Sequence, residues 1–239
     1  MRKKNIIKFC FKLLIVILTL IVFFIDEEAL YPTRAKPISF LGFLWLILML
    51  DFMFQFFPFT FGIRGDKKQF ASHYQALKVN DDEFNQNKKR NDHRATVVMI
   101  VWLLGNSVAL VLYLFNIVRE AHLVVLMMLY YLGDLVCVLF YCPFQDLILR
   151  SKCCTDCRIY GWGNIFIVTP MAFIFSFYSI SLFVIGLALF ILWEIRYHAH
   201  PERFYKATNG YLKCQGCTEK TCMKRLKIVT KFSKKEETL

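Results

Sequence analysis

Glycine and proline are scarce in this chain, which has 10 glycines and 6 prolines among 239 residues. That scarcity excludes collagen-like and low-complexity classes, and the 25 phenylalanines exclude an intrinsically disordered chain. Histidine is also rare, and His122 is the one histidine that falls inside a predicted apolar span, at its rim. A haem bundle with axial histidines deep in the membrane is therefore excluded.

The sequence also lacks the motifs of several large enzyme classes. It contains no phosphate-binding loop, no nucleophile elbow and no zincin helix. Enzyme status therefore stays open at this stage.

Apolar residues are abundant, since 57% of the chain is drawn from AVILMFWYC, against about 45–50% in soluble proteins even with glycine counted. Predicted spans lie at residues 6–25, 37–63, 95–118 and 122–142, and a longer uncharged run extends from Ile159 to Trp193. That run exceeds one span and barely suffices for two, so Pro170 and the polar residues 176–181 favour a kinked span or a short helical hairpin. The predicted fold is an all-α membrane bundle with four full transmembrane helices.

The basic residues indicate which side of the membrane each segment faces. If the last apolar run returns to its own side, 27 of the 30 Lys and Arg lie on one side; if it crosses once, the division is 16 to 14. The positive-inside rule favours the first arrangement, which puts both termini in the cytosol of a plasma-membrane protein. The alternative is one kinked span with Trp162 and Trp193 in opposite aromatic belts.

This topology divides the chain into membrane and cytosolic segments. The predicted segments are transmembrane helices 1 and 2 in residues 1–63, a cytosolic loop in 64–94 with a short helix around 69–79, transmembrane helices 3 and 4 in 95–142, a cysteine-rich cytosolic loop in 143–158, the hairpin or kinked span in 159–193, and a basic cysteine-rich tail in 194–239.

The tail and the net charge of +12 indicate a partner. From Met223 to Lys235, basic residues alternate with apolar ones, a pattern typical of a helix that lies on anionic lipid. Because the positive charge flanks the predicted spans, we assign it to lipid rather than to nucleic acid.

The nine cysteines give the sharpest chemical signal. A two-residue gap lets two thiolates turn toward one ion, and two such pairs complete a tetrahedral site. We therefore predict a zinc or iron–sulfur site made of two CxxC pairs and their neighbouring cysteines, namely Cys154, Cys157, Cys214 and Cys217, with Cys153 and Cys222 beside them. Cys142, which precedes Pro143, is a further candidate ligand for a cluster.

Other roles for the cysteines are weighed against metal binding. Structural disulfides need an oxidising compartment, which the basic residues place on the opposite face. Palmitoylation suits single juxtamembrane cysteines but not paired ones, whereas redox-active thiols remain an alternative. Cys10 and Cys137 lie inside apolar helices, where a small buried hydrophobic residue is the simplest interpretation.

Four segments of the C-terminal half carry a resemblance. They are Cys153 to Trp162, Trp193-Glu194, His200 to Phe204 and Cys214 to Cys222. Together they resemble a family of uncharacterised bacterial multi-pass membrane proteins that share these cysteine motifs. The resemblance implies a membrane protein and no particular activity.

Two carboxylates lie at mid-span, Asp51 in the second span and Asp134 in the fourth. Each costs at least about 2.5–3.5 kcal/mol at the bilayer centre, so each requires a compensating interaction. With no Lys or Arg expected at the same depth, the countercharge would be a proton, a cation or a cationic ligand. The two aspartates therefore mark either neutral interhelical hydrogen bonds, a proton or cation pathway, or a ligand site.

Three functions follow from these patterns. The first is a membrane protein whose cytosolic cysteine-rich cap binds zinc or an iron–sulfur cluster, which braces the bundle or passes electrons. The second is a small proton or cation transporter or channel that uses Asp51 and Asp134. The third is a membrane thiol oxidoreductase.

Overall fold

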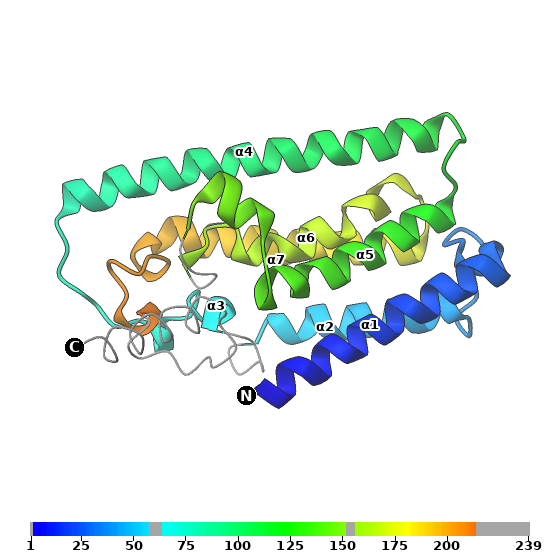
Figure 1. Cartoon of the computed structure of the whole chain (residues 1–239), viewed down its shortest axis with the longest axis horizontal. Helices are drawn as coiled ribbons and strands as arrows, with labels where there is room; N and C mark the ends of the chain where they lie inside the picture. Colours follow the sequence, from blue (N-terminus) through cyan, green and yellow to red (C-terminus); the bar gives the residue numbers. More distant parts are fainter. Residues whose placement is uncertain (1, 58–63, 152–155, 214–239) are drawn as a thin grey trace, which may run out of the picture.

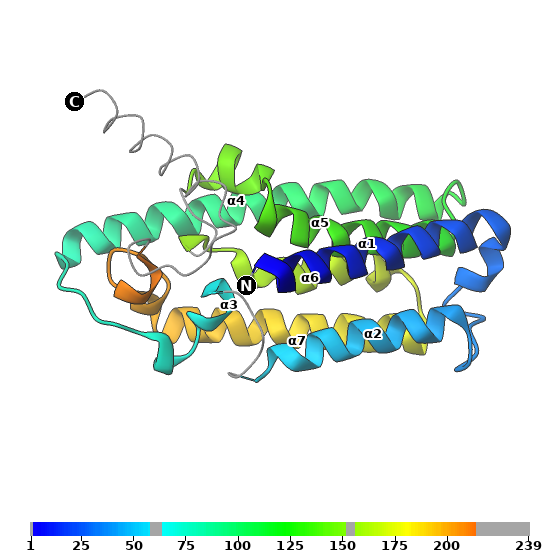
Figure 2. The same cartoon turned by 60° about the horizontal axis from the view of Figure 1, so that its bottom comes forward.

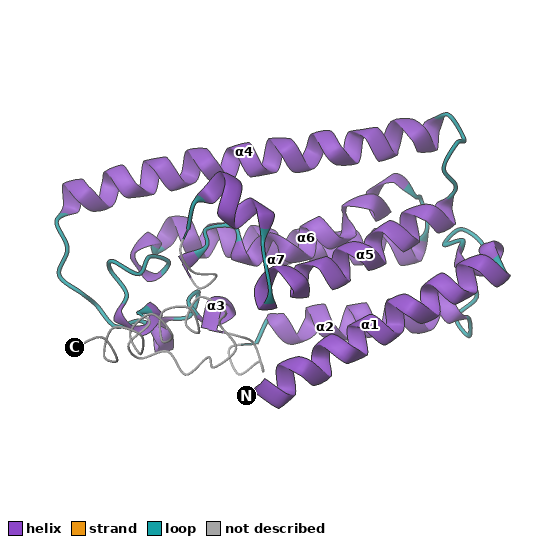
Figure 3. Cartoon of the chain, in the orientation of Figure 1, coloured by secondary structure: helices purple, strands orange, loops and turns teal. Residues whose placement is uncertain are grey.

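The computed structural model describes residues 2–57, 64–151 and 156–213. Within these ranges the protein is helical and contains no β-strand, so the predicted all-α class is confirmed (Figure 3). One isolated antiparallel bridge joins Ala76 and Asn209.

The longer helices run roughly along one common axis (Figure 1). In chain order the helical elements are α1 (Arg2–Ile25), η1 (Glu27–Leu30), α2 (Phe40–Gln55), α3 (Arg64–Lys67), η2 (Ala71–His73), α4 (Asp81–Leu114), α5 (Glu120–Leu139), the π-helix η3 (Phe144–Leu149), η5 (Tyr160–Trp162), α6 (Gly163–Val168), η6 (Thr169–Phe173), α7 (Phe177–Ala199), η7 (Pro201–Arg203) and η8 (Gly210–Leu212).

Four helices are long and apolar enough to cross a membrane: α1 from Ile6 onward, α4, α5 and α7. The predicted span at 37–63 differs from the structure, because α2 has 16 residues and ends at Gln55. Its length of about 24 Å, at about 1.5 Å per residue, falls short of the roughly 30 Å hydrocarbon core. The number of long spans agrees with the prediction, but α7 takes the place of α2 among them.

Large apolar side chains face outward on these helices. On α4, Leu104, Val108 and Leu114 are each at least 60% exposed. An apolar surface of this extent is what lipid-facing helices present and is rare on soluble monomers. The surface therefore supports a membrane location independently of helix length.

Helix α4 begins well before its apolar part, so residues 81–94 are helical and not part of a loop. The side chain of Asn80 accepts a hydrogen bond from the backbone N–H of Asp82, and Asp81, Asp82 and Glu83 occupy the first turn. An Asn cap with acidic residues behind it is a strong helix start, and no glycine or proline interrupts the chain until Gly105. The expected helix around 69–79 is limited to the three residues of η2.

The long run of residues 159–193 folds back on itself. Helix α6 and η6 pack against α7, and residues 174–176 form the reversal between them. Ser176 begins α7 by accepting a hydrogen bond from the backbone N–H of Ser179 at 3.2 Å. The close contact requires Gly186, where a Cβ atom would lie 2.7 Å from Cγ2 of Val168.

Because of this reversal, α7 ends on the side of the bundle from which α4 starts (Figures 1 and 2). The start of α1, the end of α2, the start of α4 and the ends of α5 and α7 lie there, as two views show (Figures 1 and 2). The described parts of the loop 64–94, the loop 143–158 and the tail from residue 194 lie at the same end. We call it the cysteine end.

Two clusters of buried side chains hold the helices together. The apolar core lies between α1, α2, α5, η6 and α7, and its members include Leu44, Phe52, Met128, Met171 and Leu182. The end cluster lies at the cysteine end and is mainly aromatic, with members that include Trp162, Trp193, Tyr197, Phe204 and Tyr205.

Candidate functional site

Of the six predicted metal ligands, Cys157 is the one that lies within the described residues. Its side chain is buried in the end cluster. Cys153, Cys154, Cys214, Cys217 and Cys222 lie outside the described residues. The geometry of the complete site is therefore approached from Cys157 and from the residues that flank the two motifs.

The residues that flank the two motifs are in direct contact. The backbone N–H of Lys206 donates a hydrogen bond to Oδ1 of Asp156 at 2.8 Å. Asp156 directly precedes Cys157, and Lys206 belongs to the segment that leads to Cys214. The described residues that flank the two motifs thus lie at the same end of the bundle.

Buried aromatic residues anchor the segment that leads to the second motif. Phe204 lies edge-to-face against Trp193, with ring centroids 5.1 Å apart, and Leu212 is 2% exposed. Asn209 accepts a hydrogen bond from the backbone N–H of Gln75 at 3.1 Å. The described chain therefore stays attached to the bundle almost to Cys214.

Cys157 faces a cavity of about 220 Å³ between α4, α5 and α6. Cys137 near the end of α5 and Cys142 just after it line the same cavity, together with Asp134. Cys137 was interpreted as a small buried hydrophobic residue, but the structure places it on a cavity wall beside other thiols. Cys10, by contrast, is exposed on α1.

Two of these thiols form a hydrogen bond with each other. Cys137 donates a hydrogen bond to Cys142, which lowers the pKa of the Cys142 thiol to about 7. A substantial fraction of Cys142 is therefore thiolate at neutral pH, and the thiolate is the form that binds metals and attacks disulfides. This pair could not be predicted from the sequence. The two residues are five apart, and α5 ends between them, so helical spacing does not apply.

Among the described residues, no group of three or more His, Cys, Asp or Glu side chains is arranged to hold a metal ion. Cys157 would need ligands from the segments that the structure does not describe. The donor set itself suits zinc and iron, since thiolates are the ligands that both prefer in structural and electron-transfer sites.

A buried ionic network supports the Cys157 segment, and the sequence did not predict it. Arg158 is 7% exposed and donates to Glu194 through Nη1 at 2.8 Å and to Asp92 through Nε at 3.2 Å. The guanidinium also lies 3.5 Å from the centroid of the Tyr197 ring. Burial alone lowers the pKa of Arg158, but the hydrogen bonds that Arg158 donates to Glu194 outweigh it and raise the pKa, so the group stays charged.

Further contacts tie this network to the backbone around Cys157. Trp162 donates to Glu194 at 2.6 Å, and the fully buried Lys68 donates to the carbonyl oxygen of Cys157 at 2.7 Å. The sequence pointed to this network only by placing charged residues next to aromatic ones, as in Trp193-Glu194. Spacing could not pair them, because Asp92, Arg158 and Glu194 are far apart in the chain.

The two aspartates predicted at mid-span converge from different helices. Asp51 accepts a hydrogen bond from the hydroxyl of Tyr131 at 3.3 Å, and Asp134 lies one turn further along α5. The carboxylate of Asp134 packs so closely on Gly163 that a Cβ there would lie 2.3 Å from Oδ1. Both aspartates therefore lie where α5 meets other helices, α2 for Asp51 and α6 for Asp134.

The expectation that no basic side chain shares their depth is wrong. Nζ of Lys12 lies 3.8 Å from Oδ2 of Asp51 and 3.7 Å from the centroid of the Tyr131 ring. Lys12 sits on α1 inside the first predicted span, where its long apolar stem is compatible with a helix interior. A proton or cation is therefore not required to balance Asp51.

Comparison with known protein families, with characterised proteins and with solved structures found no match.

Proposed function

We propose that this is an integral membrane protein of the plasma membrane that binds a soft metal, zinc or an iron–sulfur cluster, through cysteines at the cysteine end. The ligands are Cys154, Cys157, Cys214 and Cys217, with Cys153 and Cys222 available to a cluster. The observation that carries the proposal is the contact between Asp156 and Lys206, which brings the flanks of both CxxC motifs together.

The physical argument is the cost of leaving thiolates unbalanced. Cys157 is buried, and a buried anion is expensive unless it is paired or coordinated. A metal that takes two cysteines from each motif would also clip the tail onto the bundle. Binding free energy at such a site is folding free energy, so the metal would brace the protein even if it passes no electrons.

Elemental analysis of the purified full-length protein tests this proposal. We expect about one equivalent or more of zinc or iron after purification under reducing, anoxic and chelator-free conditions. Single changes to serine at Cys154, Cys157, Cys214 or Cys217 should lower both the metal content and the melting temperature. Cys10→Ser is the matched control, because Cys10 is an exposed cysteine on α1.

A metal-free wild-type protein under those conditions would end the metal proposal. Loss of metal in the Cys10→Ser variant alone would also contradict the assigned ligands.

The cytosolic orientation of this end is part of the proposal and has its own test. The distribution of Lys and Arg supports it, because the segments rich in them leave the bundle at the cysteine end. A peptide epitope added after Leu239 of the otherwise unchanged protein should be labelled by an added antibody only after cells are opened. Labelling of intact cells from outside would contradict the cytosolic orientation of this end.

A second function, thiol oxidoreduction, is favoured by the hydrogen-bonded pair Cys137 and Cys142. Oxidation would join the two sulfurs in a disulfide and release two protons and two electrons to an acceptor such as a lipid-soluble quinone. The cavity beside them is lined by Trp102, Phe144 and Phe166 and is large enough for a single aromatic ring.

Ubiquinone-1 is the probe that separates this function from metal binding. If the pair is redox-active, the reduced protein should reduce ubiquinone-1 by one equivalent and lose two free thiols, and Cys142→Ser should abolish both changes. No quinone reduction by wild type would exclude the oxidoreductase without affecting the metal proposal.

A proton or cation pathway through Asp51 and Asp134 is the remaining candidate. Lys12 weakens it, because it supplies the positive charge that the pathway was inferred to need. Proton flux into liposomes that is lost in Asp134→Asn would restore this candidate.

A further inference from the structure

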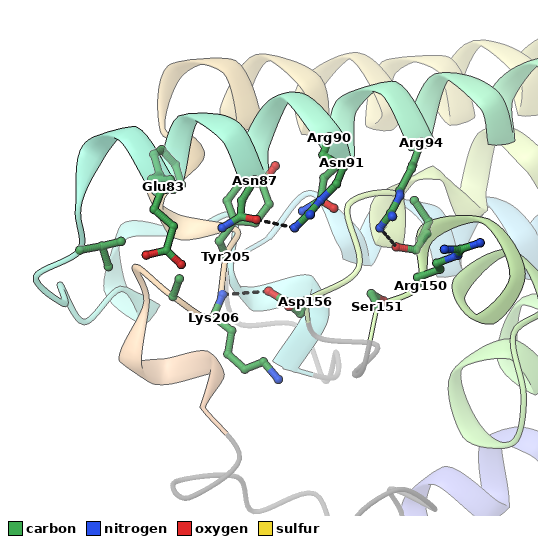
Figure 4. Close-up of a pocket in the computed structure, with 14 residues that line it drawn as sticks. Glu83, Asn87, Arg90, Asn91, Arg94, Arg150, Ser151, Asp156, Tyr205 and Lys206 are labelled. Carbon is green, nitrogen blue, oxygen red and sulfur yellow. Dashed lines mark hydrogen bonds between the residues drawn. The ribbon is translucent and has the colours of Figure 1, made fainter.

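A second cavity, of about 260 Å³, lies at the cysteine end where α4 extends beyond its apolar part (Figure 4). One wall is α4 between Glu83 and Arg94, another is the chain from Leu149 to Ser151 that follows η3, and the third is residues 205–207. None of the residues in these walls is a proposed metal ligand or redox thiol.

Positive charge gathers on two of the walls. Arg90 and Arg94 come from α4, and Arg150 comes from the chain after η3, as the close-up shows (Figure 4). Arg94 donates through Nη1 to the carbonyl oxygen of Leu149 at 3.0 Å, and Arg90 donates through Nη2 to Oδ1 of Asn87 at 2.5 Å. Both acceptors are neutral, so these contacts orient the guanidinium groups without cancelling their charge.

Neighbouring basic residues behave differently. Lys88 lies 3.0 Å from Oδ2 of Asp92, and Arg158 is paired with Glu194 and Asp92. Within the described part of the chain, Arg90, Arg94 and Arg150 take part in no such ion pair. The structure thus separates basic residues that hold the fold from three that retain net charge around a cavity.

Two carboxylates of the described chain also border the cavity, but neither forms an ion pair with these arginines. Asp156 accepts the backbone N–H of Lys206 at 2.8 Å. Glu83 belongs to the first turn of α4 and lies at the far end of the cavity from Arg94 and Arg150 (Figure 4).

The backbone of Arg150 is a second, independent observation. It has φ 50° and ψ 36°, the left-handed conformation, at the end of η3. Glycine or asparagine occupies this position without strain, whereas a residue with a long side chain does not. Strained backbone of this kind clusters at ligand sites, where the side chain placed there offsets its cost.

We propose that this cavity binds a phosphate group, as a phosphate mono- or diester carried by a small soluble molecule or by a lipid headgroup. Guanidinium groups suit phosphate because their planar donors can form paired hydrogen bonds to its oxygens. The volume is slightly below the roughly 300–1,000 Å³ of sites for drug-sized ligands, which fits a headgroup-sized anion. Arg94 directly precedes the apolar part of α4, so the cavity opens near the level at which lipid phosphates lie.

Binding to the full-length protein in lipid nanodiscs tests the proposal and distinguishes the two sources. In phosphatidylcholine nanodiscs, inorganic pyrophosphate titrated by calorimetry probes a soluble ligand. Nanodiscs with added phosphatidylglycerol probe a headgroup, through the rise in melting temperature relative to phosphatidylcholine alone.

The variants are Arg90→Gln and the double change Arg90→Gln with Arg150→Gln. Lys89→Gln is the matched control, because Lys89 is an exposed residue of the same helix and does not line the cavity. One of the two ligands, pyrophosphate or phosphatidylglycerol, is expected to bind the wild-type protein. The double change should weaken that binding by at least about tenfold, since each lost hydrogen-bond donor to a charged group is worth about tenfold or more. Lys89→Gln should stay within about twofold of wild type, as expected for a screened surface charge.

Pyrophosphate binding that is sensitive to Arg90→Gln identifies a soluble ligand, and a sensitive phosphatidylglycerol effect identifies a headgroup. If neither probe acts, or if Lys89→Gln weakens binding as much as Arg90→Gln, the proposal is overturned. Arg90→Gln disturbs only an exposed side chain, so it remains informative if the double variant does not fold.

Discussion

The apolar core and the end cluster hold the same helices together by different physics. In the apolar core, side chains such as Leu44, Phe52 and Met128 are buried against one another, and the ion pair of Lys12 with Asp51 lies beside Tyr131, another member. In the end cluster, Arg158 lies beside the rings of Trp162 and Tyr197, and the polar atom of each ring donates a hydrogen bond to a carboxylate. Trp162 donates to Glu194, and Tyr197 donates to Asp92 at 2.7 Å.

The two regions should therefore differ in how strongly a single substitution destabilises them. Apolar packing loses free energy in proportion to the volume removed, whereas a buried ion pair fails sharply when one partner is lost. Because Cys157 belongs to the end cluster, we expect that network to support the proposed metal site.

The largest expected effect comes from Arg158→Met. This change leaves Glu194 and Asp92 without their buried cation, which should lower the free energy of unfolding by about 3–5 kcal/mol. Thermal unfolding in detergent measures it. The matched control is Arg119→Gln at the opposite end, where the pair with Glu27 is exposed to solvent and should contribute little to stability.

If Arg158→Met and Arg119→Gln shift the melting temperature equally, the end cluster is not a distinct ionic unit. Adding Glu194→Gln to Arg158→Met should recover part of the loss, because it removes the unpaired charge.

Gly161→Ala should have the next largest effect. A Cβ at this position would lie 2.2 Å from the ring of Trp193, a rigid neighbour that is itself buried. We expect a destabilisation of about 1–3 kcal/mol from overpacking. Gly105→Ala on α4 is the control, because a Cβ there meets nothing within 4 Å and should stabilise the helix by about 0.5–1 kcal/mol. A neutral Gly161→Ala would show that the end cluster yields as readily as a loosely packed surface.

Asp51→Asn should have a smaller effect on stability. It removes the charge opposite Lys12 and weakens the hydrogen bond from Tyr131, with an expected loss of about 0.6–1.7 kcal/mol. The double change Asp51→Asn with Lys12→Met should be closer to wild type than Asp51→Asn alone. If the single and double variants are equally destabilised, Lys12 is not the countercharge.

The smallest effect concerns the titration of Cys142. Its thiol should react with iodoacetamide with a midpoint near pH 7, and Cys137→Ala should move that midpoint up toward the ordinary 9.0. Because the folded-state pKa is depressed, the thiolate adds stability above the unfolded-state pKa, and this is lost as the pH falls through about 7. A midpoint that does not change in Cys137→Ala would remove the hydrogen bond as the cause.

Several features of the fold were predictable because they depend on local composition. Long apolar runs predicted the helical class and the positions of α1, α5 and most of α7. The prediction for α2 was too long, because uncharged residues beyond Gln55 are not part of the helix. The start of α4 was missed, although the cap at Asn80 and the acidic turn after it are visible in the sequence.

The candidate site was less predictable, for a physical reason. CxxC pairs are short-range patterns, so the sequence identified Cys157 and the other motif cysteines. The pairing of Cys137 with Cys142, and of Arg158 with Glu194, depends on where the chain reverses and on which helices meet.

The residues alone predicted a helical bundle with long apolar spans, a positive charge concentrated on one side of the membrane, and two CxxC pairs. These properties follow from side-chain chemistry and short-range spacing. Helix packing, by contrast, folds residues 159–173 back on α7, brings Lys12 to Asp51, and lines one cavity with three arginines that form no ion pair within the described residues. Such contacts join residues tens of positions apart, and they arise when helices pack to bury their shared faces, which no local pattern encodes.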